Sequence, residues 1–240
     1  YKAVQSELRF DGKVQSAYQQ ALCGNLPELL LPLFDFCERN VGDFKDAAMR
    51  LYGCRGVYVP SVMSGTFGRL GSDRPQDVYF TGCAGWMAQL YYDYYAYTLD
   101  EKFLKTRALP FMKEVALFYE EFLKLDKNGK YLSSPSCVPY GESALGEEDR
   151  HVGVNAEIDF AILRQLLERL IESSKKTGLF ADEAEKWKDM LRKIPYTTQI
   201  GDFVADYGIA GKNITERKSF ASLYDAVVAK KTDGDDAKVA

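Results

Sequence analysis

The stretch from Tyr79 to Glu142 constrains the fold more than any other part of the chain. It contains an aromatic-rich helical pattern, a second long amphipathic pattern, an Asp-Lys-Asn-Gly turn and a polar loop punctuated by prolines. Tyr and Trp bury large apolar faces while keeping a polar tip, which suits either a protein core or a surface that stacks on sugars. Paired helices followed by a long loop are typical of an α/α toroid, in which loops at one end form a pocket.

Apolar spacing predicts helices along most of the chain, and no segment shows sustained strand alternation. Asp43 and Asp100 are expected N-caps, and Pro195 is expected to end the last helix. The expected helices span 27–40, 43–51, 82–98, 100–124, 155–177 and 180–194. The sequence therefore predicts an all-α fold. A helical repeat array is the alternative, and unequal helix and loop lengths argue against it.

Two segments fit this helical pattern less well. Residues 1–24 are ambiguous, with an extended start. Residues 53–75 are rich in Gly, Ser and Pro, and a loop this long inside a compact domain is usually functional.

Composition argues against several classes of protein. The net charge is -4 without a dense Lys/Arg stripe, so no nucleic-acid partner is expected. No run approaches the roughly 18 apolar residues of a membrane helix, so no membrane partner is expected. The chain has one histidine and five scattered cysteines without a CxxC pair, so neither a metal nor another cofactor is expected. Unpaired thiols favour a reducing, cytoplasmic location, and a secreted or periplasmic location is open if a signal peptide was removed.

The two ends of the sequence suggest a division of the chain. It starts at Tyr1 without Met and finishes in the polar stretch KKTDGDDAKVA. We expect residues 1–200 to form part of a catalytic domain, and residues 201–240 to hold the end of that domain and a polar tail. We also expect this chain to belong to a longer polypeptide or to associate as a homo-oligomer.

Five segments, in order, carry a family resemblance: PLFDFCERN, AAMRLYGCRGVYV, FTGCAGWMAQLYYDYYAYTLDEKFLK, GKYLSSPS and NAEIDFAILRQLLERLIES. Together they resemble the catalytic domain of glycoside hydrolase family 95 across roughly residues 8–200. That family contains inverting α-L-fucosidases and related α-L-galactosidases on a six-hairpin (α/α)6 barrel. The resemblance implies a partial (α/α)6 toroid and a carbohydrate substrate.

Two motifs depart from the family pattern. The family places its general acid, a Glu, after the Ser-Pro-Ser motif and a Pro, where this chain has Tyr140 and reaches Glu142 two residues later. The family also carries two Asn residues before a Val-Gln pair, where this chain has Asp11 and Lys13. A divergent sugar specificity is therefore as compatible with the sequence as a fucosidase.

Inverting hydrolysis needs a protonated carboxylic acid at the leaving oxygen and a base that activates water on the opposite face of the sugar. Glu142 is the candidate acid, and a solvated loop residue beside other acids is the alternative. Asp11 is the candidate base, and a turn residue paired with Gly12 is the alternative. Both readings remain open at the level of sequence.

The expected substrate contacts lie in the same motifs. Three of these expected contacts have a structural alternative. Trp86 could pack in the core, Asp159 could stabilise a helix N-terminus, and His151 could simply be exposed. The expected contacts are Gln15, Trp86, Ser136, Tyr140, His151, Asn155 and Asp159. The resulting hypothesis is a glycoside hydrolase that uses an inverting, two-carboxylate mechanism on an oligosaccharide or glycoconjugate. The alternative is a non-catalytic carbohydrate-binding or structural helical module.

Overall fold

Helices dominate the structure, which is a computed structural model. It describes residues 7–64, 66–138 and 152–197, together with four two-residue strands between residues 199 and 213. The helices are α1 (Lys13–Cys23), α2 (Leu31–Arg39), α3 (Val41–Tyr52), α4 (Pro75–Val78), α5 (Cys83–Thr98), α6 (Glu101–Phe103), α7 (Leu109–Phe122), α8 (Glu157–Thr177) and α9 (Ala184–Lys193). A 3-10 turn, η1 (Pro27–Leu30), precedes α2, and a π-helical turn, η2 (Leu104–Ala108), joins α6 to α7.

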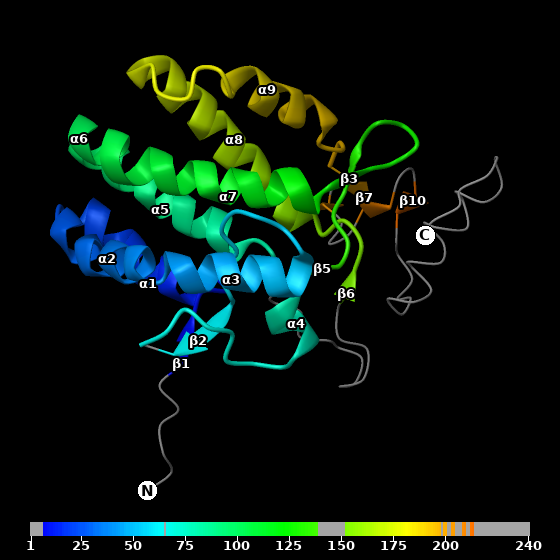
Figure 1. Ribbon diagram of the computed structural model, residues 1–240, viewed down its shortest axis with the longest axis horizontal. Coiled ribbons are helices and arrows are strands. Elements are labelled where there is room, and N and C mark those ends of the chain that lie inside the picture. Colours follow the sequence, from blue (N-terminus) through cyan, green and yellow to red (C-terminus); the bar gives the residue numbers. More distant parts are fainter. Residues whose placement is uncertain are drawn as a thin grey trace, which may run out of the picture.

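The longer helices in the described part of the chain form two layers. α5 contacts both α1 and α8, so these three helices form one layer. α3, α7 and α9 follow α1, α5 and α8 in the chain and run along the other side (Figure 1). Ion pairs connect this second layer: Lys45 with Glu114 at 2.7 Å and Lys186 with Glu120 at 2.9 Å. Pairs of inner and outer helices are the repeating unit of an α/α toroid.

Short two-stranded ladders lie in the loops, which the sequence patterns did not reveal. β1 (Glu7–Arg9) pairs antiparallel with β2 (Val62–Ser64), β3 (Lys124–Leu125) with β4 (Tyr131–Leu132), and β5 (Ser136–Cys137) with β6 (Val152–Gly153). β7 (Gln199–Ile200) pairs with β8 (Phe203–Val204), and β9 (Gly208–Ile209) with β10 (Lys212–Asn213). Ladders of two or three residues give too little alternation to detect from sequence.

The aromatic residues of α5 explain why this helix lies at the centre. Tyr91 stacks on Phe111 at 4.6 Å, contacts Phe34 at 4.1 Å, and donates a hydrogen bond to the Phe34 carbonyl at 3.2 Å. Tyr97, one and a half turns further on, is exposed. The tyrosines therefore point in different directions, and those that are buried pack in the core.

Two helix starts and one continuous helix were predicted wrongly. Asp43 is not an N-cap, because α3 already begins at Val41, and its carboxylate accepts the Gly68 amide at 3.2 Å instead. The helix expected from 180 begins at Ala184, after a turn in which Phe180 has φ 57°.

The helix expected over 100–124 is interrupted. Asp100 caps it as predicted and accepts the Phe103 amide at 2.9 Å. The chain then makes the π-helical turn η2 before α7, where Pro110 stands in the first turn. Because proline has no N–H to donate to the preceding turn, a local change of winding is expected at that point.

The loop over 53–75 is held firmly against the helices. The Val57 amide bonds to the Glu114 carbonyl at 3.0 Å, and the Phe10 amide bonds to the Ser61 carbonyl at 2.7 Å. Gly56 has φ +84°, and a Cβ there would collide with the backbone of α7 near Phe118. The loop thus fixes β1 and the start of α1 against α7.

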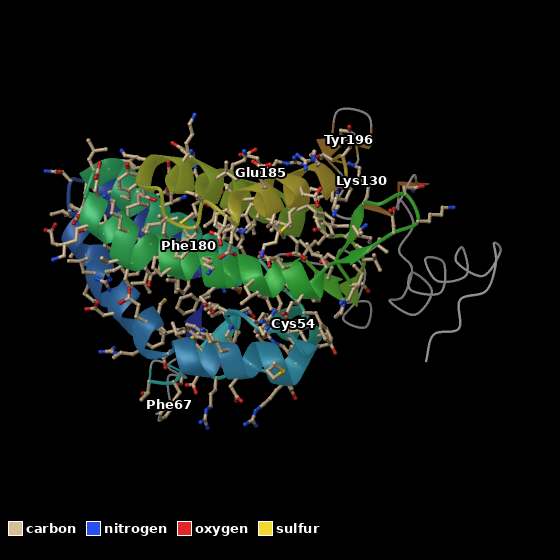
Figure 2. All side chains as sticks on the ribbon, turned by 45° about the horizontal axis from the view of Figure 1, so that its top comes forward. Cys54, Phe67, Lys130, Phe180, Glu185 and Tyr196 are labelled. Carbon is tan, nitrogen blue, oxygen red and sulfur yellow. The ribbon has the colours of Figure 1, made fainter. Side chains whose placement is uncertain are left out.

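Two cation–aromatic contacts involve residues of the loops next to the helices. Lys130 lies 5.1 Å from the centre of the Tyr196 ring, and Lys113 lies 4.5 Å from that of Phe180. Figure 2 shows Lys130 and Tyr196 near one another at the strand-bearing end and Phe180 on the helical body. Among the described helices, none is long and apolar enough to span a membrane.

Candidate functional site

Three buried carboxylates lie around the start of α5. Asp11, Asp77 and Asp159 are each only 2–3% exposed. Burial raises the pKa of the Cys83 thiol, and the negative charges of Asp11, Asp159 and Asp77 raise it further. Since electrostatic effects of this kind need proximity, these residues, from distant parts of the chain, share one neighbourhood.

Asp11 and Asp77 share one guanidinium group. Arg9 Nε donates to Asp11 Oδ2 at 3.1 Å, and the terminal nitrogen of Arg9 donates to Asp77 Oδ1 at 3.1 Å. Asp77 also accepts hydrogen bonds from Ser72 at 2.6 Å and Arg74 at 2.7 Å. Asp11 Oδ1 is buried and has no hydrogen-bond partner among the described residues. The candidate base is thus ion-paired through one oxygen, while its other oxygen is unused.

Asp159 has a different environment, made of hydroxyl groups. Its Oδ2 accepts from Ser136 Oγ at 2.7 Å and from Ser133 Oγ at 3.4 Å. Burial raises its pKa to about 7, and hydrogen bonding to Ser136, Thr81 and Ser133 limits the rise. Asp159 Oδ1 and Thr81 Oγ1 nevertheless lack a hydrogen bond of standard geometry. Asp159 lies in the first turn of α8 but points into the interior.

Ser136 and Asn155 connect this carboxylate to the backbone. Ser136 Oγ accepts the Ala156 amide at 2.9 Å while its hydroxyl donates to Asp159. Asn155, at φ 60°, accepts the Ser133 amide on its side-chain oxygen at 2.8 Å. Both side chains are therefore committed to holding β5 against the start of α8. Their expected contact with substrate stays a prediction.

A hollow of about 340 Å³ lies between α1 and α5. Trp86 forms one wall and is half-buried, with its ring in edge-to-face contact with Phe80 at 5.4 Å. The other lining side chains are mostly polar. They belong to Gln15, Ser16, Gln19, Gln89, Leu90 and Asp93, and the backbone of Gly12 completes the lining.

Gln15 lines the hollow but also serves the local backbone. Its amide nitrogen donates to the Phe10 carbonyl at 3.0 Å, and its oxygen accepts the Gly12 amide at 3.0 Å. This is the geometry of a capping glutamine at the third position of a helix. The Val-Gln pair therefore has a structural role in starting α1, alongside its predicted contact with substrate.

Asp93 is a candidate binding residue in this hollow that the sequence analysis did not single out. Burial raises its pKa, while Arg169 and a hydrogen bond from Gln89 oppose that rise. Trp86, Gln89, Leu90 and Asp93 follow the i, i+3, i+4, i+7 spacing of one helix face, which was the available signal. The aromatic residues of α5 obscured it.

Three predicted residues fall outside the described part of the chain: Glu142, Tyr140 and His151.

A second hollow, of about 320 Å³, runs along α8, with Arg164 and Gln165 among its lining residues. Within the described ranges, no group of three or more His, Cys, Asp or Glu side chains could hold a metal ion. The five cysteines are unpaired; four are buried, whereas Cys23 is exposed.

Sequence comparison decides the family. Residues 3–205 match the family described as "Glycosyl hydrolase family 95 catalytic domain". The chain belongs to glycoside hydrolase family 95. One relative is Alpha-L-fucosidase 2 of Arabidopsis thaliana. It is 26% identical to this chain over 168 residues, which cover 69% of this chain. The match covers 20% of the fucosidase, so the chain spans about a fifth of that relative's length.

A solved structure supports the fold of this family 95 chain. A protein described as a kojibiose phosphorylase from the human microbiome superimposes with a TM-score of 0.62 at 14% identity. The superposition covers 84% of this chain and 30% of the other. At this identity the likeness concerns the fold alone. The predicted fold class, all-α and part of an (α/α)6 toroid, is confirmed.

Proposed function

We propose that this chain supplies a sugar-binding part of the catalytic unit of an inverting glycoside hydrolase. The substrate would be an oligosaccharide or glycoconjugate, with an α-L-fucoside or α-L-galactoside as the first candidates. The observation that carries the proposal is the hollow between α1 and α5, where a half-buried Trp86 faces amide and carboxyl groups in a family 95 chain.

The chemistry of this hollow suits a sugar ring. A pyranose has an apolar face of C–H groups, which packs on an aromatic ring such as Trp86. Its hydroxyls both donate and accept hydrogen bonds, as do the amides of Gln19 and Gln89. Asp93 adds an acceptor at the far end of the same helix face. The hollow, at about 340 Å³, lies within the usual range for small-molecule pockets.

In the proposed reaction, a water oxygen forms the new bond to the anomeric carbon as the bond to the leaving oxygen breaks. Glu142 would give its proton to the leaving oxygen, and Asp11 would accept a proton from the water. Asp11 Oδ1 is the oxygen available for that role, because Oδ2 is paired with Arg9. Asp11 directly precedes Gly12, which lines the hollow.

The test uses the protein that carries these 240 residues at its natural length. Hydrolysis is measured on a panel of aryl glycosides, including α-L-fucoside and α-L-galactoside, and on an oligosaccharide with the same terminal sugar. Inversion is checked by NMR of the first-formed anomer.

Glu142→Gln should abolish turnover of the oligosaccharide and leave sugar binding unchanged. It should slow an activated aryl glycoside much less, since a good leaving group needs little proton assistance. Full activity of Glu142→Gln on the unactivated substrate would place the acid elsewhere. Sugar binding without hydrolysis of any substrate would replace the enzyme by a carbohydrate-binding module.

A further inference from the structure

The three buried aspartates differ in what compensates their charge. Asp11 contacts the guanidinium of Arg9, and Asp77 contacts those of Arg9 and Arg74. Among the described residues, Asp159 has only hydroxyl partners, from Ser133 and Ser136, with Thr81 near. A buried carboxylate without a counter-ion is costly in its charged form. Among these three carboxyl groups, Asp159 is therefore the one whose protonation should contribute most to the stability of the fold.

The other titratable groups around Asp159 do not offset its charge. Four of them face it from neighbouring elements: Tyr52 on α3, Cys83 on α5, Tyr119 on α7 and Cys137 on β5. Burial raises the pKa of each of these groups, so they stay neutral over the physiological range. The carboxylates of Asp11 and Asp77 lie beyond Cys83 and are themselves paired.

Residues 133–137 cover Asp159. Two side chains of this segment bond directly to the carboxylate. Three further hydrogen bonds, one of them between backbone groups, join the segment to the residues before α8. The Asn155 amide donates to the Ser133 carbonyl at 2.8 Å, and the Ser133 amide donates to Asn155 Oδ1 at 2.8 Å. The Ala156 amide bonds to Ser136 Oγ at 2.9 Å. Opening of these bonds would uncover this side of the Asp159 carboxylate, which is 2% exposed when they are closed.

We propose that Asp159 is a positioning residue that holds residues 133–137 against the start of α8 while it is protonated and loosens them when it ionises. Burial of the neutral acid requires few partners, whereas the anion gains hydration when the segment opens. Binding of the proton and closure of the segment therefore favour each other, which is the linkage expected for a group whose pKa is raised by burial.

Linkage also sets the pH window. When the segment is open and Asp159 is hydrated, its pKa returns toward 3.8, the value of an exposed Asp. When the segment is closed, the pKa is about 7. The opening equilibrium should rise by up to about tenfold per pH unit between these two values and level off above the higher one. This prediction does not depend on the proposed glycosidase function, although any effect on turnover rests on it.

Amide hydrogen exchange of the intact protein between pH 4.5 and 8 tests the proposal, after correction for the intrinsic pH dependence of exchange. The reporters are the amides of Ser133, Asn155 and Ala156. Their opening should increase roughly tenfold or more between pH 5 and 7 and stay level above pH 7. Amides of α9 should show no such step.

Asp159→Asn keeps the shape of the side chain and removes its titration, so the step should disappear. Ser133→Ala removes only the longer hydrogen bond, and this variant should keep the step. Ser133→Ala also serves as the folded comparison if Asp159→Asn does not fold. A flat profile at the three amides in the wild type, or an unchanged step in Asp159→Asn, would overturn the proposal.

Discussion

Ile162 of α8 packs directly over Gly85 of α5. A Cβ at position 85 would lie less than 3.0 Å from Ile162 Cγ2, closer than real Cβ atoms approach other groups. Gly85 is buried inside α5, where glycine costs about 1 kcal/mol relative to alanine. The presence of glycine in the first turn of this helix is therefore explained by the close approach of α5 and α8, which brings Asp159 near the start of α5.

Gly85→Ala should lower the free energy of unfolding by about 1–2 kcal/mol, since overpacking outweighs the gain in helix propensity. Ile162→Ala leaves a cavity and should cost about 2–5 kcal/mol on its own. In the double variant the new methyl group has room. The loss in unfolding free energy of the double variant should therefore be smaller than the sum of the losses in the two single variants. Urea unfolding measures all three. Gly42→Ala is the control, because an added Cβ meets nothing within 4 Å there; it should be neutral or stabilising.

The two tryptophans provide a test of the hollow. Trp86 is half-buried and lines it, whereas Trp187 is fully buried on α9. A bound sugar should therefore change the fluorescence of Trp86 alone. Titration with the terminal monosaccharide should give a signal in Trp187→Phe and none in Trp86→Phe.

Affinity for the sugar should depend on residues that line the α1–α5 hollow and not on residues that line the hollow along α8. Gln89→Ala removes a hydrogen-bonding side chain from the hollow and should weaken binding by about three- to tenfold. Gln165→Ala is its matched control, since Gln165 lines the separate hollow along α8. Equal effects of the two variants, measured by calorimetry, would move the sugar away from the α1–α5 hollow.

Arg9 should matter more to stability than its neighbour Arg74. Arg9→Met removes the cation from buried Asp11 and one partner from Asp77, and breaking such a pair costs about 3–5 kcal/mol. Arg74→Met leaves Asp77 paired with Arg9 and bonded to Ser72, so its effect should be smaller. Asp11→Asn added to Arg9→Met should recover part of the loss. The denaturant midpoints of the four proteins check this order.

Asp159 should also give overall stability a defined pH dependence. Its pKa is about 7 in the folded protein and lies near 3.8 when it is exposed. The folded state thus binds the proton more tightly, so the contribution to stability is full below about pH 4 and is lost as pH rises to about 7. The loss is at most on the order of 4 kcal/mol. Subtracting the unfolding curve of Asp159→Asn from that of the wild type should isolate it; a difference that grows as pH falls below 4 would contradict the assignment.

Local sequence signals predicted the helical elements well where the apolar spacing was regular. α5 and α8 lie within two residues of their expected bounds, and Asp100 caps as expected. The turn at Asp126–Gly129 was also readable, since Asp126 accepts the amides of Asn128 and Lys130 at 2.8 Å. The five motifs in order were sufficient to indicate the family.

The candidate site was less predictable because its properties come from contacts between distant residues. The sequence singled out Asp11 and Asp159 as carboxylates, and it singled out Trp86 as a large aromatic residue. It did not indicate that Arg9 joins Asp11 to Asp77, 66 residues further along the chain. Nor did it indicate that, within the described ranges, Asp159 is paired with hydroxyl groups alone.

The sequence by itself determined most of the helical segments and which residue types are available, because helix formation and capping depend on neighbours within a few positions. The tertiary structure alone decided which carboxylate is paired, which is buried without a cation and which faces the hollow. Desolvation and Coulomb energies depend on distance through space, and helix packing sets those distances.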